Sequence, residues 1–282
     1  GYPAGAATFA QALEEAEGDL ALEVELHDRL AWSRATTEGP AAGYPHAQAS
    51  LAAAEQLGDS DLLADALSHV AFVDATAGRE GALEALSRAL ELRPDRGWAP
   101  ILGRPDWSLA LVLQWSGDLV GARAAFAALE REALDRGDEG SYPWLLYELA
   151  TIDLLLGAWG QARQVAEACL AVVEERGQPD QRALGLAALA AVDAREGRVG
   201  EAEHAIAQGL DAARANGNVA QRWWFQSTHG LLQLSLGHTA EAAGSLGEML
   251  GELDGAGMGE PAMYRVHGDA IEAFVGVGDL DA

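Results

Sequence analysis

Lysine is absent from the 282-residue chain, so all 18 basic residues are arginine, and they stand against 44 acidic residues. Without lysine the chain cannot contain a Walker A loop, whose lysine contacts the nucleotide phosphates. The net charge of −26 repels phosphate backbones, which argues against binding of DNA or RNA. We therefore expect no cofactor and no nucleic-acid partner for this chain.

Cysteine is nearly absent as well. The single cysteine, Cys169, cannot form a disulfide within the chain, and its place in the middle of an apolar helix is typical of a small buried residue. The seven histidines include no pair four residues apart and none with a neighbouring cysteine, which argues against a zinc site. No bound metal is expected.

Long hydrophobic runs are also missing. The longest apolar stretch, residues 183–192, is far shorter than the roughly 20 residues that a membrane helix needs. Residues 1–30 carry several glutamates and no unbroken apolar core, so they do not resemble a secretory signal. Val, Ile and Thr are sparse and form no alternating runs of strand length. These absences predict a soluble, cytoplasmic, all-α protein that does not contact a membrane.

Glycine, by contrast, is abundant and regularly spaced. One series is Gly58, Gly97, Gly137, Gly177, Gly217 and Gly257, and the other is Gly39, Gly78, Gly117, Gly157, Gly197, Gly237 and Gly278, with steps of 39 to 41 residues in both. Glycine adopts the left-handed conformation that commonly ends a helix without steric cost. The two series therefore predict stacked units of about 40 residues, each made of two helices.

This spacing predicts helices along the whole chain. The expected ranges are 4–16, 20–35, 46–57, 61–77, 81–92, 101–116, 119–136, 142–156, 159–176, 180–196, 199–216, 219–236, 239–254 and 262–277.

Small residues recur in phase with the first glycine series. Ala71, Ala110, Ala150, Ala190, Gly230 and Ala270 fall in the middle of the first helices, and Ala122, Ala162, Ala202 and Ala242 fall early in the second helices. The pattern resembles the tetratricopeptide repeat, lengthened from about 34 residues to about 40. That resemblance implies a right-handed superhelical solenoid of about seven antiparallel helix pairs, whose first helices line a concave groove.

Residues 93–106 interrupt the repeats with three prolines and two glycines. Because proline lacks an amide proton and clashes with the preceding turn, we expect an irregular joint here. It would separate N-terminal repeats (1–92) from C-terminal repeats (107–282) within one continuous solenoid. The chain stops at Ala282, where a second helix should begin, so we expect a piece of a longer solenoid whose uncapped end allows self-association.

Several longer segments resemble one family in particular. They are LAW (30–32), AAEQLGD (53–59), GDEGSYPWLL (137–146), LSLG (234–237) and DAIEA (269–273). In this order and spacing they resemble the helical repeat region of large ATP-binding LuxR-type transcription regulators, the class that includes the maltose-responsive activators. The resemblance implies an ATPase module before this region and a helix-turn-helix module after it in the parent chain. The region itself would sense a small effector or a protein segment.

The positions expected to face the groove are rich in aromatic, arginine and amide side chains. The candidate ligand-binding residues are Arg104, Trp107, Gln114, Trp115, Trp144, Tyr147, Thr151, Arg195, Trp224, Ser227, Tyr264 and His267. Aromatic rings beside such donors suit a sugar, an aromatic metabolite or an apolar peptide. The alternative is that these large side chains fill gaps between long helices. Trp223 and Trp224 are about 100° apart on a helix, so at most one of them can face the groove squarely.

Asp74, Asp153 and Asp193 recur at one repeat position and imitate a catalytic carboxylate pair. Their spacing places them on neighbouring first helices, where ion pairs with Arg123 or Arg163 are expected instead. No Ser, His and Asp arrangement follows from the spacing, so we expect no catalytic residue and no enzyme. A sensor domain of a transcription regulator is therefore the leading prediction. A free-standing scaffold for protein-protein interaction is the alternative.

Overall fold

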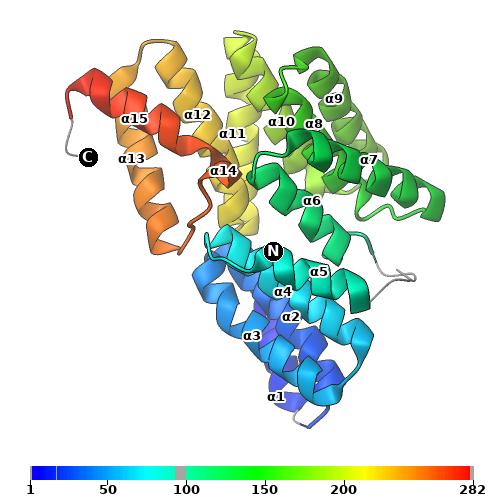
Figure 1. Cartoon of the computed structure of the whole chain (residues 1–282). Coiled ribbons are helices and arrows are strands. Elements are labelled where there is room, and N and C mark those ends of the chain that lie inside the picture. The colour runs from blue at the N-terminus through cyan, green and yellow to red at the C-terminus, as the bar shows by residue number, and fades with distance from the viewer. Residues whose placement is uncertain (1, 17, 93–99, 280–282) are drawn as a thin grey trace. The chain divides into compact units, whose positions relative to one another are not determined.

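The computed structural model describes residues 2–16, 18–92 and 100–279 (Figure 1). Within these residues the regular elements are all helices, and no strand occurs. The helices are α1 (Tyr2–Glu15), α2 (Leu20–Thr37), α3 (Pro40–Leu57), α4 (Ser60–Thr76), α5 (Ala82–Leu92), α6 (Pro105–Trp115), α7 (Leu119–Arg136), α8 (Tyr142–Leu155), α9 (Trp159–Glu175), the short 3-10 helix η1 (Pro179–Gln181), α10 (Arg182–Arg195), α11 (Val199–Asn216), α12 (Val219–Ser235), α13 (Thr239–Gly255), α14 (Pro261–Tyr264) and α15 (Val266–Val277). The predicted all-α class is confirmed. None of the helices in the described ranges has the length and apolarity needed to cross a membrane.

The contacts divide the chain into two compact units. Unit 1 comprises residues 1–142 and 256–260, and unit 2 comprises residues 143–255 and 261–282. Unit 1 therefore contains α1 to α7, and unit 2 contains α8 to α15 apart from the first residue of α8. Part of the expected joint, residues 93–99, lies outside the described residues, as does Ala282. Residues 100–104 contain no helix.

Glycine ends the helices as its spacing predicts. Each member of the two series within the described residues has a φ between 63° and 104°. Gly58, Gly137 and Gly217 are left-handed C-caps of α3, α7 and α11. Side chains other than hydrogen are strained in this conformation, so the regular glycines fix the length of the repeat.

Three of the predicted ranges differ from the structure by more than two residues or are divided, whereas the other helix ends agree within two residues. Helix α6 begins at Pro105 rather than at residue 101, because proline suits the first helical turn, where its missing amide proton costs nothing. Helix α3 begins at Pro40 rather than at residue 46 and continues through Pro45. The range 262–277 is split into α14 and α15 by Arg265, which has a left-handed φ of 53°.

Small residues lie where helices of each unit touch. Ala110, Ala150 and Ala190 are each at most 1% exposed. A Cβ placed on Gly230 would lie 2.1 Å from Cδ2 of Leu246, so glycine lets α12 and α13 approach closely. These in-phase small residues are therefore buried at helix contacts.

Residues 256–260 follow α13 in the sequence but belong to unit 1. The amide of Ala41 donates to the carbonyl oxygen of Ala256 at 3.1 Å. The amides of Gly259 and Glu260 both donate to the carbonyl oxygen of Thr76, at 3.0 and 3.1 Å. These bonds hold the segment against the start of α3 and the end of α4.

Candidate functional site

The candidate site is the face that α8, α10 and α12 form in unit 2, which we call the aromatic face. Tyr147 of α8 and Trp224 of α12 stack with their ring centroids 4.8 Å apart and their planes at 30°. Trp144 meets the same Trp224 ring edge-on at 6.0 Å. Tyr147 and Trp224 also pack against a buried cluster that includes Ala187 and Ala190 of α10. The small side chains of α10 thus allow aromatic residues of the helices on either side to meet.

The three rings of the aromatic face are half-buried. Part of each ring therefore packs on the unit and part remains accessible. Burial, reinforced by the neighbouring Glu148, raises the pKa of Tyr147 well above its ordinary value, and a hydrogen bond with Thr151 opposes the shift. Tyr147 is consequently neutral at physiological pH.

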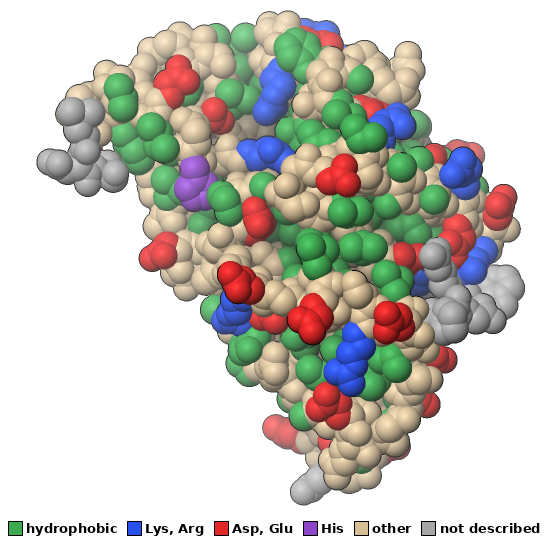
Figure 2. Space-filling view, viewed as in Figure 1, with side chains coloured by type: hydrophobic (Ala, Val, Ile, Leu, Met, Phe, Trp, Pro, Cys, Tyr) green, Lys and Arg blue, Asp and Glu red, His purple; other side chains and the backbone are tan. Residues whose placement is uncertain are grey.

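Among the charged side chains of unit 2, Arg195 of α10 interacts with Asp269 of α15. Arg195 is exposed and donates from Nη1 to the carbonyl oxygen of Ala191 at 3.1 Å. Partial desolvation and the charge of Arg265 lower the pKa of Arg195, while Asp269 opposes the shift. Among the described residues Arg195 forms no ion pair. In Figure 2, arginine side chains lie beside a hollow in the surface.

The remaining unit 2 candidates are divided between the interior and the surface. Tyr264 is 6% exposed, and its ring meets Trp223 edge-on at 5.5 Å. Trp223 is 2% exposed and donates from Nε1 to Glu252 at 2.9 Å. Ser227 is half-buried and donates to the carbonyl oxygen of Trp224, and His267 is exposed. Of the two adjacent tryptophans, Trp224 is therefore the accessible one.

In unit 1, two candidates lie in the interior rather than on an open face, contrary to prediction. Trp107 is 2% exposed because its ring packs edge-on against Phe126 at 5.3 Å. Gln114 is 5% exposed. Trp115 packs against Phe72 with ring centroids 5.9 Å apart and also borders a cavity. Of these three residues, Trp115 borders a space that a ligand can enter.

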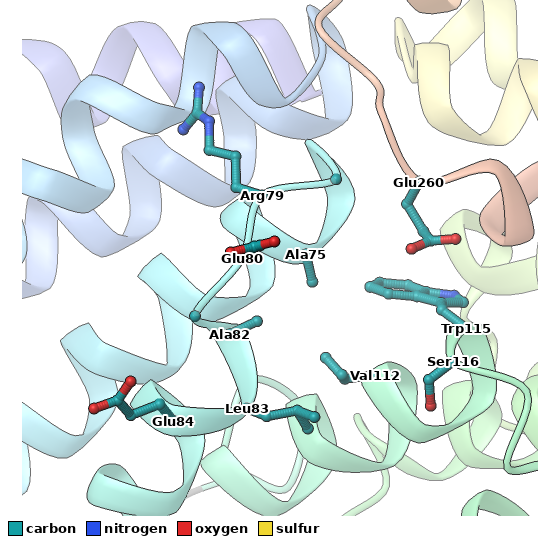
Figure 3. Close-up of a pocket in the computed structure, with 12 residues that line it drawn as sticks. Ala75, Arg79, Glu80, Ala82, Leu83, Glu84, Val112, Trp115, Ser116 and Glu260 are labelled. Carbon is teal, nitrogen blue, oxygen red and sulfur yellow. The ribbon is translucent and has the colours of Figure 1, made fainter.

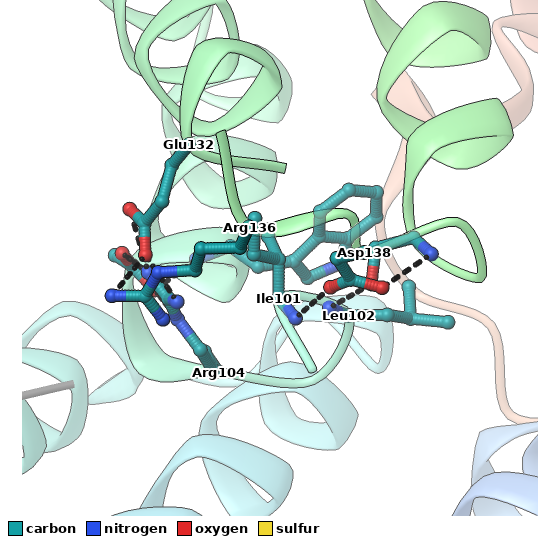
Figure 4. A network of polar contacts seen from close by, with 9 residues as sticks. Ile101, Leu102, Arg104, Glu132, Arg136 and Asp138 are labelled. Atoms are coloured by element: carbon teal, nitrogen blue, oxygen red, sulfur yellow. Dashed lines mark hydrogen bonds and ion pairs between the residues drawn. The ribbon is translucent and has the colours of Figure 1, made fainter. Parts of the chain in front are cut away.

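Arg104 is also an interior residue, and its partners explain why (Figure 4). It is 3% exposed and forms ion pairs with Asp106 at 2.6 Å and with Glu132 at 2.7 Å. Its hydrogen bond holds the pKa of Glu132 below the ordinary value. Nearby, Asp138 accepts a hydrogen bond from the amide of Ile101 at 2.8 Å. Arg104 therefore ties the start of α6 to α7, which corrects its prediction as a groove residue.

Two of the three recurring aspartates form ion pairs with arginines. Asp193 pairs with Arg163, as predicted, and also with Arg198 at 2.7 Å. Asp74 pairs with Arg79 at 3.2 Å. Ion pairing accounts for the environment of Asp74 and Asp193.

Cys169 is fully buried, and its thiol donates to the carbonyl oxygen of Pro143 at 3.3 Å. Burial raises the pKa of the thiol to about 12, so it is protonated and unreactive. The described part of the chain holds no group of three or more His, Cys, Asp or Glu residues that could bind a metal ion.

A cavity in unit 1 contains residues that the sequence analysis did not select (Figure 3). Trp115 of α6 borders it together with residues of α4, α5 and the segment 256–260. Counting along one repeat could not reveal it, because Glu260 and Ala75 are far apart in the sequence. The GAGMGE run at 255–260 departs from the helical pattern, and it is the sequence feature that could have indicated this cavity.

Comparisons with known proteins bear on the fold. No protein-family model and no curated protein sequence matches the chain. Among solved structures, the chain is similar to a Rap protein crystallised in complex with Competence and Sporulation Factor. The TM-score is 0.64 and the sequence identity 14%, over 92% of this chain and 76% of that chain. At this identity the likeness concerns the fold alone, and it confirms the predicted helical solenoid.

Proposed function

We propose that this chain is a binding region, not an enzyme, and that the aromatic face of unit 2 recognises a protein segment or a small effector. The carrying observation is that Trp144, Tyr147 and Trp224 meet on one face while remaining half-exposed. Rings in this state stack on planar or apolar groups of a ligand. Arg195, which belongs to α10 of the same unit, adds donors that suit a carboxylate or carbonyl group.

A protein segment is the ligand that we favour. The Rap protein of similar fold was solved in complex with Competence and Sporulation Factor, which supports a binding role for a solenoid of this kind. The aromatic face draws its rings from α8 and α12, on either side of α10, so it suits an elongated ligand that offers more than one apolar group.

We further propose that the region is the sensor of a LuxR-type transcription regulator that works in the cytoplasm. The sequence resemblance supports this proposal, and so does the charge of −26, which leaves DNA binding to another module of the parent chain. ATP hydrolysis would likewise belong to an ATPase module. The coding sequence around this region tests the proposal, because a regulator requires an ATPase module before it and a helix-turn-helix module after it. Their absence would favour a free-standing scaffold.

A peptide panel tests the binding proposal directly. Tryptophan fluorescence and calorimetry are recorded while short peptides of random sequence are titrated into the full chain, with a panel of simple sugars in parallel. We expect apolar or aromatic peptides to change the fluorescence, and Trp224→Ala to abolish the change. Trp159→Ala is the matched control, since Trp159 is 40% exposed at the start of α9 and not in the aromatic face. If no peptide or sugar changes the fluorescence or releases heat, or if Trp224→Ala binds as tightly as the wild type, the rings only fill space.

A further inference from the structure

Unit 1 contains a cavity of about 500 Å³ that is separate from the aromatic face (Figure 3). This volume lies within the range of roughly 300 to 1,000 Å³ that is typical of small-molecule sites. Its apolar lining includes the ring of Trp115 and the side chains of Ala75, Leu83 and Val112. Leu83 is 50% exposed. A ligand in this cavity would therefore cover apolar surface that now faces water.

The charged side chains around the cavity are mainly acidic. The cavity is lined by three glutamates and one arginine, namely Glu80, Glu84, Glu260 and Arg79. In Figure 3 the carboxylate of Glu84 points away from Trp115, so the preference for a cationic ligand comes mainly from Glu80 and Glu260.

The arginine does not cancel this preference, because it already has partners. Nη1 of Arg79 lies 3.2 Å from Oδ1 of Asp74. The guanidinium carbon stands 3.8 Å from the centroid of the Tyr44 ring. In Figure 3 the guanidinium group points away from Trp115. The charge that the cavity offers to a ligand is therefore negative.

The position of Glu260 is fixed by the backbone. The amides of Gly259 and Glu260 both donate to the carbonyl oxygen of Thr76. A Cβ on Gly259 would lie 2.3 Å from the carbonyl oxygen of Ala77, so only glycine permits this close approach. Figure 3 shows the Glu260 carboxylate beside the ring of Trp115. The segment thus combines an anionic group with an aromatic ring at one edge of the cavity.

We propose that this cavity binds a small organic ammonium ion that carries an apolar body. The ring of Trp115 attracts a cation placed near its face. Glu80 and Glu260 accept charge-assisted hydrogen bonds from the ammonium group. The apolar body packs against Leu83 and Val112. Neither a neutral nor an anionic analogue gains all of these interactions.

Phenethylammonium and 2-phenylethanol form a suitable pair of probes, since they differ only in the charged group. Each is titrated into the full chain while the methyl resonances of Leu83 and Val112 are followed by NMR. We expect phenethylammonium to shift both resonances with a Kd on the order of 1 mM or tighter. The alcohol should bind at least several-fold more weakly. Added salt should weaken the binding of the ammonium ion and leave that of the alcohol unchanged.

The double variant Glu80→Gln/Glu84→Gln tests the role of charge without touching the packed interior, since both side chains are exposed. It should weaken the binding of phenethylammonium about five- to tenfold, because partly exposed ion pairs contribute modestly to binding. The affinity for 2-phenylethanol should stay unchanged. Glu203→Gln/Glu248→Gln is the matched control, because it removes the same charge from exposed positions in unit 2.

Three outcomes would overturn the proposal. The first is that neither probe shifts the Leu83 and Val112 resonances, which means that there is no site. The second is that the alcohol binds as tightly as the ammonium ion. The third is that the two double variants weaken the binding of phenethylammonium equally, which would mean that binding depends only on the overall charge of the chain.

Discussion

Tyr147 and Trp224 stack with 4.8 Å between their ring centroids, although α10 lies between their helices in the sequence. Alanines on α10 make this contact possible. The rings therefore have two roles at once, since their inner parts pack on unit 2 and their outer parts remain half-exposed. Removing a ring from a binding surface weakens ligand binding more than it lowers stability, whereas removing an interior ring does the opposite.

Replacing one ring of the aromatic face and one interior ring should therefore give opposite results. Trp107→Ala should cost about 3 to 5 kcal/mol of unfolding free energy, because the side chain is 2% exposed. Trp144→Ala should cost distinctly less but should weaken ligand binding by about 1 to 3 kcal/mol, as expected for an aromatic anchor. Chemical denaturation and calorimetry measure the two effects. Equal losses of stability would identify Trp144 as a packing residue.

Small residues at the helix contacts should resist enlargement. Ala150 is 1% exposed and belongs to a buried cluster with Ala166 and Ala188. Ala150→Leu should therefore cost about 1 to 3 kcal/mol through overpacking. Ala171→Leu, at an exposed position of α9, should change the unfolding free energy by at most about 0.5 kcal/mol. Urea denaturation of both variants makes the comparison, and an unaffected Ala150→Leu would mean that the contact is looser than the structure shows.

The repeat was readable from sequence because glycine spacing reports a backbone constraint. Positive φ at the described members of both series follows from sterics that need no tertiary information. The positions of the small residues could also be found from the sequence, because Ala110 and Ala190 lie at a fixed distance from those glycines, and both are buried. Fold class and unit length were thus predictable from local chemistry.

The candidate site was less predictable, because a fixed count along the repeat assumes that all first helices start in the same register. Helix α6 starts at Pro105, after a loop held by Asp138, so Arg104 precedes the helix and Trp107 turns inward. Where the repeats are regular, the same count selects Trp144 and Trp224, which are half-exposed in the structure. The cavity in unit 1 depends on Glu260, whose backbone contact with Thr76 has no repeat period to reveal it.

The close backbone approach of residues 256–260 gives a third prediction. A methyl group on Gly259 would meet the carbonyl oxygen of Ala77 at 2.3 Å, and neither backbone can move without losing hydrogen bonds to Thr76. Gly259→Ala should therefore cost about 1 to 3 kcal/mol. Gly244→Ala is the control, because its Cβ would meet nothing within 4 Å in the middle of α13, and it should gain about 0.5 to 1 kcal/mol. Thermal unfolding compares them, and a stabilised Gly259→Ala would contradict the docking of this segment.

The pairing of His69 with Asp28 leads to a pH dependence in unit 1. Nδ1 of His69 lies 3.3 Å from Oδ1 of Asp28. Burial by itself lowers the pKa of His69, but the charge of Asp28, its hydrogen bond and the nearby Asp65 outweigh burial and raise the pKa. Burial lowers the pKa of His27 and His46, which therefore act in the opposite direction.

A raised pKa in the folded state means that protonated His69 stabilises the fold. This contribution is fully present below the unfolded pKa of about 6.5 and is lost as the pH rises through the higher folded value. His69→Gln should therefore lower the melting temperature most at about pH 5.5 and much less at about pH 9. Subtracting the variant from the wild type at each pH cancels the contributions of His27 and His46, which both proteins share. Asp28→Asn should remove most of the difference, since it removes the charge that raises the pKa. A gap between wild type and His69→Gln that stays constant across this range would show that His69 is neutral in the folded protein.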